Sequence, residues 1–173
     1  MKNLDNFFKA CYENKVTEVR RYLDEGLDIN TGDRYGVTGL MTAMNNGNTE
    51  AVRILLSCNN IKIGTKDKYG KTALHWASYD NQVECVEMFL AHPTCNKDIV
   101  QIKDKFGETA EIKAGNQDCA RLLREFSATA DKNVQSMNDT KRTNLKNTKE
   151  EIKGKIVEKN SQFDERNLYE EYD

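Results

Sequence analysis

The chain has 173 residues, which suits one domain or one domain with a tail. Apolar residues make up 38% and charged residues 31%, so the apolar content is a little low for a fully packed globule. The net charge of -2 gives no overall attraction to nucleic acid or to an anionic membrane. The N-terminal segment carries charges where a secretory signal needs an apolar core, and no apolar run approaches the roughly 20 residues that span a bilayer.

Five cysteines occur without a CxxC pair: Cys11, Cys58, Cys85, Cys95 and Cys119. Together with the absence of a signal peptide, they predict reduced thiols in the cytoplasm, with the nucleus as a second location. His92 and Cys95 are close in sequence, but no second pair lies near them, so a loop containing both is favoured over a zinc site. We therefore predict no metal, no cofactor and no membrane insertion.

The first segment, residues 3–32, has the pattern of two short helices followed by the sequence GLDIN, which leads into the next segment. Ala10 lies on the first expected helix, and Val19 and Leu23 lie on the second. Their spacing places apolar side chains on one face of each helix. The segment lacks the turn that opens each of the later segments.

A first block of sequence then recurs three times, as DRYGVTGLMTA from Asp33, DKYGKTALHWA from Asp67 and DKFGETAEIKA from Asp104. The interval between the last two starts is slightly longer than the interval between the first two. An Asp followed by Gly at the fourth position of the block predicts a turn. The Thr two positions further on predicts the N-cap of a short helix, at Thr38, Thr72 and Thr109.

A second block recurs as GNTEAVRILL from Gly47, NQVECVEMFL from Asn81 and GNQDCARLLR from Gly115. These starts are evenly spaced, at the interval that separates Asp33 from Asp67. The first residue of the block is expected to end the preceding helix in a left-handed conformation. The apolar residues that follow recur at helical spacing and predict a second helix with one buried face. Neither helix can bury its face alone, so the units must stack.

These segments resemble ankyrin repeats, whose pattern D-x-x-G-x-T-P-L-H-x-A opens a unit of about 33 residues. The best match begins at Asp67 and continues with Gly70, Thr72, Leu74, His75 and Ala77. The resemblance covers residues 3–126 and implies an all-α solenoid of stacked helix–loop–helix pairs with β-turn or hairpin fingers. The implied repeats are about 3–32, 33–66, 67–103 and 104–126, within a domain of residues 1–126.

The fourth repeat departs from this pattern. The interval from Thr109 to Cys119 is shorter than the equivalent interval from Thr72 to Cys85, by about one helical turn. The first helix of this repeat should be shorter by the same amount. We therefore expect a short and irregular C-terminal cap.

Residues 127–173 form a charged tail in which basic and acidic side chains are almost equal in number and few apolar residues are available to bury. Such a composition predicts either disorder or a partly helical segment. Residues 141–159 hold seven basic and three acidic side chains. That stretch could contact nucleic acid, although interspersed acids and the absence of aromatic residues favour a solvated charged segment.

Catalysis is not expected, because the chain has two histidines and no Gly-rich phosphate loop, HExxH or GxSxG motif. The resemblance implies that His75 hydrogen-bonds the turn backbone of a neighbouring repeat. Trp76 either packs between helices or leans toward the concave groove. Cys85 and Cys119 are expected to be small core residues.

The resemblance implies that a partner is bound on the concave face. Each turn tip carries a cation followed by an aromatic residue, and these residue types are frequent binding anchors. The alternative is that each ring packs over its own turn while the cations are solvated. The predicted partner-binding residues are Arg34, Tyr35, Val37, Asn45, Asn46, Lys68, Tyr69, Lys71, Tyr79, Asp80, Lys105, Phe106 and Glu108.

We therefore predict a monomeric, non-catalytic protein–protein interaction module that acts as an adaptor, a scaffold or an inhibitor. A nucleic-acid- or chromatin-associated regulator that uses the basic part of the tail is the alternative. The resemblance also implies that Asn30 occupies a position at which asparagines can be hydroxylated.

Overall fold

The computed structural model describes residues 2–130, and the structural statements that follow concern these residues. The labelled helices are α1 (Lys2–Tyr12), α2 (Val16–Asp24), α3 (Gly39–Asn45), α4 (Thr49–Leu56), α5 (Ala73–Tyr79), α6 (Val83–Leu90), α7 (Lys97–Val100) and α8 (Ala110–Lys113). Residues 117–130 are also helical. None of the described helices is long and apolar enough to cross a membrane.

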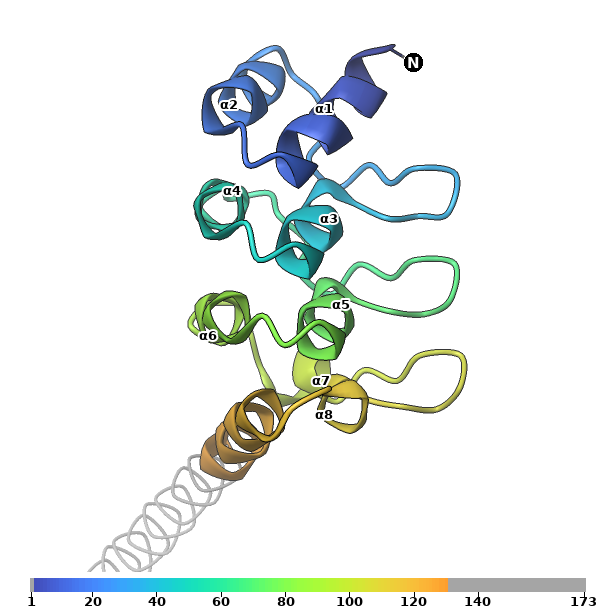
Figure 1. The fold of residues 1–173 in the computed structure, drawn as a ribbon, viewed down its shortest axis with the longest axis vertical. Coiled ribbons are helices and arrows are strands. Elements are labelled where there is room, and N and C mark those ends of the chain that lie inside the picture. Colours follow the sequence, from blue (N-terminus) through green and yellow to red (C-terminus); the bar gives the residue numbers. More distant parts are fainter. Residues whose placement is uncertain (1, 131–173) are drawn as a thin grey trace, which may run out of the picture. The chain divides into compact units, whose positions relative to one another are not determined.

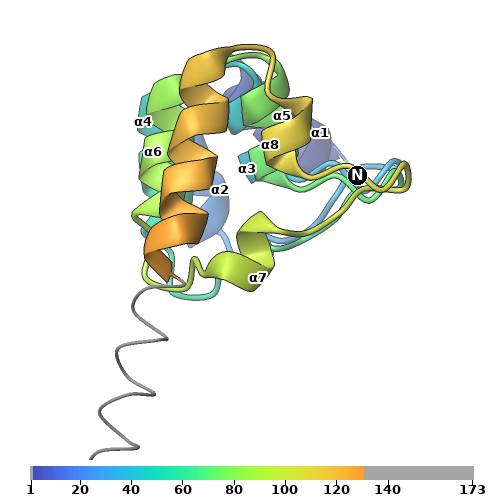
Figure 2. The ribbon, with the colours of Figure 1, turned by 90° about the horizontal axis from the view of Figure 1, so that it is seen from below.

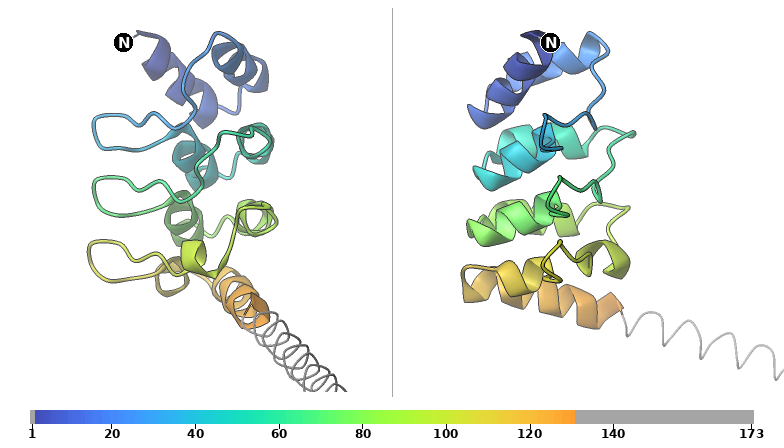
Figure 3. Two further views of the ribbon diagram at one scale, coloured as in Figure 1. Left: turned by 180° about the vertical axis from the view of Figure 1, so that it is seen from behind. Right: turned by 90° about the vertical axis from the view of Figure 1, so that its right-hand side faces the viewer.

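The helices form two columns (Figure 1). The first helices of the repeats, α1, α3, α5 and α8, make the inner column, and α2, α4, α6 and residues 117–130 make the outer column (Figures 1 and 3). Within the inner column α3 packs against α1 and α5, and α5 packs against α8. Three loops project from the inner column on the side opposite the outer helices (Figure 2). This arrangement confirms the predicted all-α solenoid.

The core lies between the two columns of helices and is formed by equivalent residues of successive repeats. Phe89 of α6 and Leu55 of α4 are fully buried, at equivalent positions of successive repeats. Ile29, Ile63 and Val100 are also buried, in the connection that follows the second helix of each repeat. Because each repeat contributes equivalent apolar side chains, neighbouring repeats bury one another's faces and the core is continuous along the stack.

The predicted helix starts are found at the three threonines. The side-chain Oγ1 of Thr38 accepts a hydrogen bond from the N–H of Met41 at 3.3 Å, and that of Thr109 accepts from Ile112 at 3.5 Å. Thr72 is the N-cap of α5, and its Oγ1 lies 2.9 Å from Nδ1 of His75. Thr38 and Thr109 thus provide an acceptor for helix N–H groups that have no partner within the helix.

The predicted left-handed helix ends are confirmed at Gly47, with φ +67°, and at Asn81, with φ +59°. The prediction for Gly115 is wrong, because the C-cap of α8 is Ala114, with φ -59° and ψ 122°, and Gly115 is not among the residues with positive φ. Glycine is needed there for a different reason. A Cβ on Gly115 would lie 2.8 Å from the carbonyl oxygen of Tyr79, against which the backbone packs.

The fourth repeat is shortened as predicted, since α8 has 4 residues whereas α5 has 7. The longer interval between Asp67 and Asp104 accommodates α7, which the sequence did not predict. Asn96 caps this helix, because its side chain accepts a hydrogen bond from the N–H of Ile99 at 3.0 Å. Residues 127–130, which the sequence assigns to the tail, continue the last described helix. The rest of the predicted tail lies outside the described residues.

Candidate functional site

Each projecting loop, here called a finger, is closed by its first aspartate. In the second finger, Oδ1 of Asp67 accepts hydrogen bonds from the N–H groups of Tyr69 at 2.8 Å and Lys71 at 2.9 Å. Asp33 and Asp104 make the same pair of bonds in the first and third fingers. The fingers comprise residues 33–37, 67–71 and 104–108. One buried or half-buried carboxylate therefore holds each finger, together with the backbone hydrogen bond from the N–H of the first residue to the carbonyl of the last.

The glycine of each finger allows the tight turn, and those of the first two fingers also allow the next finger to stack closely. Gly70 has φ +79°, and a Cβ on it would lie 3.0 Å from the backbone nitrogen of Lys105 in the next finger. The N–H of Lys68 donates to the carbonyl of Tyr35 at 2.7 Å, and that of Lys105 donates to the carbonyl of Tyr69 at 2.8 Å. These bonds join the fingers into one row along the stack (Figure 3), called the finger row below.

The finger row displays aromatic rings and cations in contact with one another. The exposed fraction is 37% for Tyr35, 44% for Tyr69 and 72% for Phe106. The Nζ atom of Lys68 lies 3.8 Å from the ring centroid of Tyr35 and 4.8 Å from that of Tyr69, so it bridges two fingers. The guanidinium of Arg34 lies 4.7 Å from the Tyr35 centroid. Lys68 and Arg34 thus lie within the distance at which a cation is attracted to the face of an aromatic ring.

The surface continues from the second finger onto α5. The Nζ atom of Lys71 lies 4.7 Å from the ring of Trp76 and 5.9 Å from the ring of Tyr79, which is 61% exposed. Trp76 is half-buried against the core and donates its Nε1–H to Oδ2 of Asp67 at 3.2 Å. Trp76 therefore packs against the core and also supports the finger.

Lys113 was not predicted as a site residue. It supports the third finger from α8, at the position that Trp76 occupies in α5 below the second finger. Its Nζ contacts Glu108, lies 3.8 Å from Oδ2 of Asp104 and lies 5.5 Å from the centroid of Phe106. Burial opposes the charge on Asp104, but the N–H groups of Glu108 and Phe106 and the cation of Lys113 lower the pKa of Asp104 overall. The signal was present, since Trp76 and Lys113 stand at the same distance along the chain from their finger aspartates.

Other predicted site residues lie at the loop that joins the helices of a repeat. Asn45 and Asn46 are half-buried, and both take part in structural hydrogen bonds. The carbonyl of Asn45 accepts from Nε2 of Gln82 at 3.2 Å, and Nδ2 of Asn46 donates to the carbonyl of Thr42 at 2.8 Å. Asp80, by contrast, is exposed at the end of α5, and Val37 is half-buried in the first finger. The structure thus places Asp80 on the open surface and gives the two asparagines a supporting role.

His75 belongs to the scaffold, as the resemblance implied. Its ring is 1% exposed, and Nε2 lies 3.1 Å from the carbonyl oxygen of Glu108 in the next finger. Nδ1 accepts a hydrogen bond from the N–H of Thr72 at 3.2 Å, so the neutral ring donates through Nε2. Burial lowers the pKa of His75 below its ordinary value of 6.5, although the bond to Glu108 acts in the opposite direction.

This lowered pKa predicts a loss of stability in mild acid. Because the unfolded chain takes up a proton on His75 more readily than the folded chain, stability is full above the ordinary pKa of 6.5 and falls as the pH drops below it. Urea unfolding of the wild type between pH 7.5 and about pH 5 should show this decline, and His75→Gln should show a shallower one. Equal slopes for the two proteins would contradict the assignment of the effect to His75.

Asn30 connects the first two repeats. Its Nδ2 donates to the carbonyl of Asn60 at 2.9 Å, and its Oδ1 accepts from the N–H of Lys62 at 2.8 Å. Both the nitrogen and the oxygen of the side-chain amide therefore form hydrogen bonds. Hydroxylation at this residue stays a prediction. His92 similarly directs Nε2 to the carbonyl of Leu56 at 3.1 Å and Nδ1 to Oγ1 of Thr94 at 2.9 Å.

Within residues 2–130, no three His, Cys, Asp or Glu side chains gather as ligands for a metal ion. The five cysteines are unpaired, and Cys11, Cys85 and Cys119 are buried. Burial raises the pKa of the Cys11 thiol to about 12 and that of the Cys85 thiol to about 11. These thiols are therefore neutral packing groups at physiological pH.

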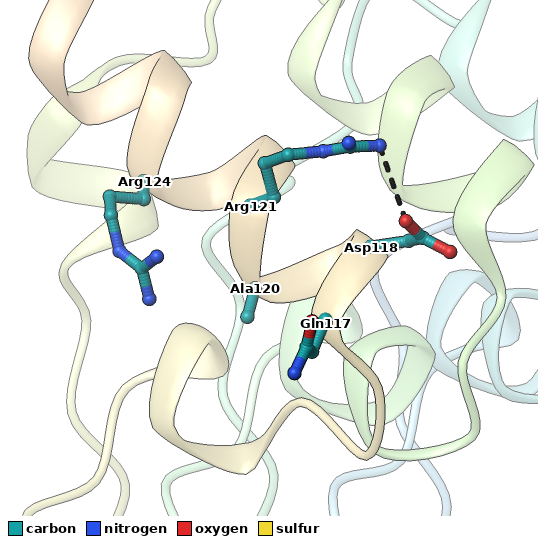
Figure 4. A pocket seen from close by; sticks show the side chains of 5 residues that line it. All are labelled: Gln117, Asp118, Ala120, Arg121 and Arg124. Atoms are coloured by element: carbon teal, nitrogen blue, oxygen red, sulfur yellow. Dashed lines mark hydrogen bonds and ion pairs between the residues drawn. The ribbon is translucent and has the colours of Figure 1, made fainter.

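A pocket lies on the fourth repeat and is lined by Gln117, Asp118, Ala120, Arg121 and Arg124 (Figure 4). Arg121 pairs with Asp118 at 3.2 Å, and Arg124 pairs with Glu111 at 3.1 Å, so the charge of both arginines is balanced locally. Arg124 is the counterpart in this repeat of Leu90 in the third, so a polar side chain replaces an apolar one on this face. A polar outer face is typical of a repeat that closes a stack.

Comparison with known proteins agrees with this geometry. The family model for ankyrin repeats in three copies matches residues 7–101, which is more than half of the chain. The chain belongs to the ankyrin repeat family, whose members are generally protein–protein interaction modules and typically non-catalytic.

A curated relative is an ankyrin repeat protein of Rickettsia bellii (strain RML369-C). It is 41% identical over 51 residues, which are 30% of this chain and 53% of that protein. The match thus spans about half the length of the relative.

Proposed function

We propose that this protein is a non-catalytic adaptor, scaffold or inhibitor that binds a partner protein through the finger row and the adjoining surface of α5. The observation that carries the proposal is the continuous exposed series of Arg34, Tyr35, Lys68 and Tyr69, joined across two fingers by backbone and cation–ring contacts. Aromatic residues and arginine are enriched among the residues that dominate binding energy at protein interfaces.

Rigidity supports the proposal further. The fingers are closed by aspartates and joined to one another by backbone bonds, so the backbone that carries the tip side chains is ordered before a partner arrives. A surface that is already ordered loses less conformational entropy on binding than a flexible loop does. The two histidines support no catalytic arrangement, because His75 is buried in the scaffold and His92 bonds to Leu56 and Thr94.

The test is affinity capture with three forms of the full-length chain. The finger variant carries Tyr35→Ala, Tyr69→Ala and Phe106→Ala, and the control carries Arg20→Ala, Arg53→Ala and Glu87→Ala on the outer helices. Proteins that the wild type and the control recover should be lost from the finger variant. If the finger variant recovers the same proteins as the wild type, the proposed surface is wrong.

The alternative, nucleic-acid binding by residues 141–159, concerns a segment outside the described residues and stays a prediction. It can be tested in the full-length chain by changing the seven basic residues of that stretch to glutamine. Salt-sensitive DNA binding that disappears with this change would favour the alternative.

A further inference from the structure

The finger row carries positive charge that the described part of the chain does not neutralise. Arg34, Lys68 and Lys105 are exposed at the same position of successive fingers, and within residues 2–130 no carboxylate lies within ion-pair distance of any of them. Lys66 and Lys103 add exposed cations directly before the second and third finger aspartates.

The finger aspartates do not offset this charge at the tips. Asp67 and Asp104 are each 6% exposed and Asp33 is half-buried, and one oxygen of each accepts two backbone N–H groups. The aspartates are therefore held at the base of the fingers, Glu108 is paired with Lys113, and the cations of the tips stand at the surface. Such a separation favours a negatively charged ligand along the row.

The positions of the rings indicate which kind of negative ligand fits. Lys68 lies over both Tyr35 and Tyr69, Arg34 also lies over Tyr35, and Lys113 lies over Phe106. Single-stranded nucleic acid binds such rows by stacking its bases on open ring faces. Because cations already lie over these rings, the arrangement favours a ligand that supplies carboxylates to the cations and packs against the ring edges.

The spacing of the fingers sets the spacing of the ligand's charges. Each finger directly precedes α3, α5 or α8 in the chain, so the spacing of the fingers follows the spacing of these packed helices. Packed helices are about 8–10 Å apart. A polyproline II segment rises about 3.1 Å per residue with three residues per turn, so every third side chain lies on one face about 9 Å further along. An acidic residue at every third position would thus meet one cation per finger.

We propose that the finger row binds an extended acidic segment of a partner protein, in which acidic residues at positions i, i+3 and i+6 pair with Arg34, Lys68 and Lys105. The tyrosine and phenylalanine edges contact the residues between them. This inference rests on the proposed function and specifies the chemistry of the partner.

The test uses two fluorescent nine-residue peptides of identical composition and the full-length protein. One peptide repeats Asp-Pro-Ala three times, and the other places its three aspartates together before the Pro-Ala residues. The repeating peptide should bind about fivefold more tightly or better, and its affinity should fall as salt is raised.

Two charge-matched variants locate the binding. Arg34→Gln, Lys68→Gln and Lys105→Gln together should weaken the repeating peptide by about tenfold or more. Arg20→Gln, Arg53→Gln and Arg121→Gln remove the same charge from the outer helices and should change the affinity less than about twofold. Urea unfolding of both variants confirms that they fold.

Equal binding of the two peptides, equal loss in both variants, or no peptide binding at all would overturn the inference. Tighter binding of an oligo-dT of equal charge through the same three cations would overturn it as well. These failures are distinct from failure of the proposed function. If no acidic peptide binds but the alanine finger variant still loses its captured proteins, only the chemistry of the partner is wrong.

Discussion

Replacement of Phe89 by alanine should lower the free energy of unfolding by about 3–5 kcal/mol, because it deletes a fully buried ring and leaves a cavity in the third repeat. Such a loss is a large fraction of the stability of a small domain, about 5–15 kcal/mol. Urea unfolding followed by circular dichroism would measure it.

Phe106→Ala provides a matched control, because it removes the same atoms from a ring that is 72% exposed. It should change the stability by no more than about 0.5 kcal/mol, since the ring gains little from burial. Since each repeat contacts only its neighbours, Phe89→Ala should also make the transition less cooperative. A change below about 1 kcal/mol for Phe89→Ala would contradict the packing described for α6.

Replacement of Asp67 by alanine should destabilise the protein by about 2–3 kcal/mol, because three donors lose a charged acceptor at once. Two of them are the backbone N–H groups that close the second finger, and the third is the indole N–H of Trp76. The change should also move the fluorescence of Trp76, the single tryptophan of the chain, toward that of a solvated indole.

Asp67→Asn is the control for this prediction, because the amide retains a carbonyl oxygen for the two backbone donors. It should lose about 1 kcal/mol. The same comparison bears on binding. In Asp67→Ala the second finger keeps only its backbone hydrogen bonds, so Lys68 should be held less firmly between Tyr35 and Tyr69, although Asp67 itself is buried. Equal stabilities of the alanine and asparagine variants would show that the finger does not depend on these bonds.

The fold could be predicted from the sequence because its causes are local and periodic. The regular repeat spacing places equivalent apolar residues such as Leu55 and Phe89 on one face of successive helices, and these faces can be buried only by stacking. Thr38 and Thr109 cap helices for reasons that involve only the next turn. The shortening of α8 was visible as a shorter interval between Thr109 and Cys119.

Features that depend on contacts between repeats could not be predicted in the same way. Gly115 stands where the sequence pattern predicts a helix end, yet glycine is required there because the chain passes close to the carbonyl oxygen of Tyr79. α7 forms in an insertion that has no counterpart in the other repeats.

The candidate site shows the same division. The sequence predicted the exposed cation and ring of each finger, but the position of Lys68 between rings of two different fingers depends on how the fingers stack. Lys113 was missed because it reaches the finger from the following helix.

Hydrogen–deuterium exchange with and without a captured partner shows whether partners are bound on the finger row. Binding should slow exchange in residues 33–37, 67–71 and 104–108 and leave exchange in the outer helices α2, α4 and α6 unchanged. Slower exchange on the outer helices, with the three fingers unaffected, would contradict it.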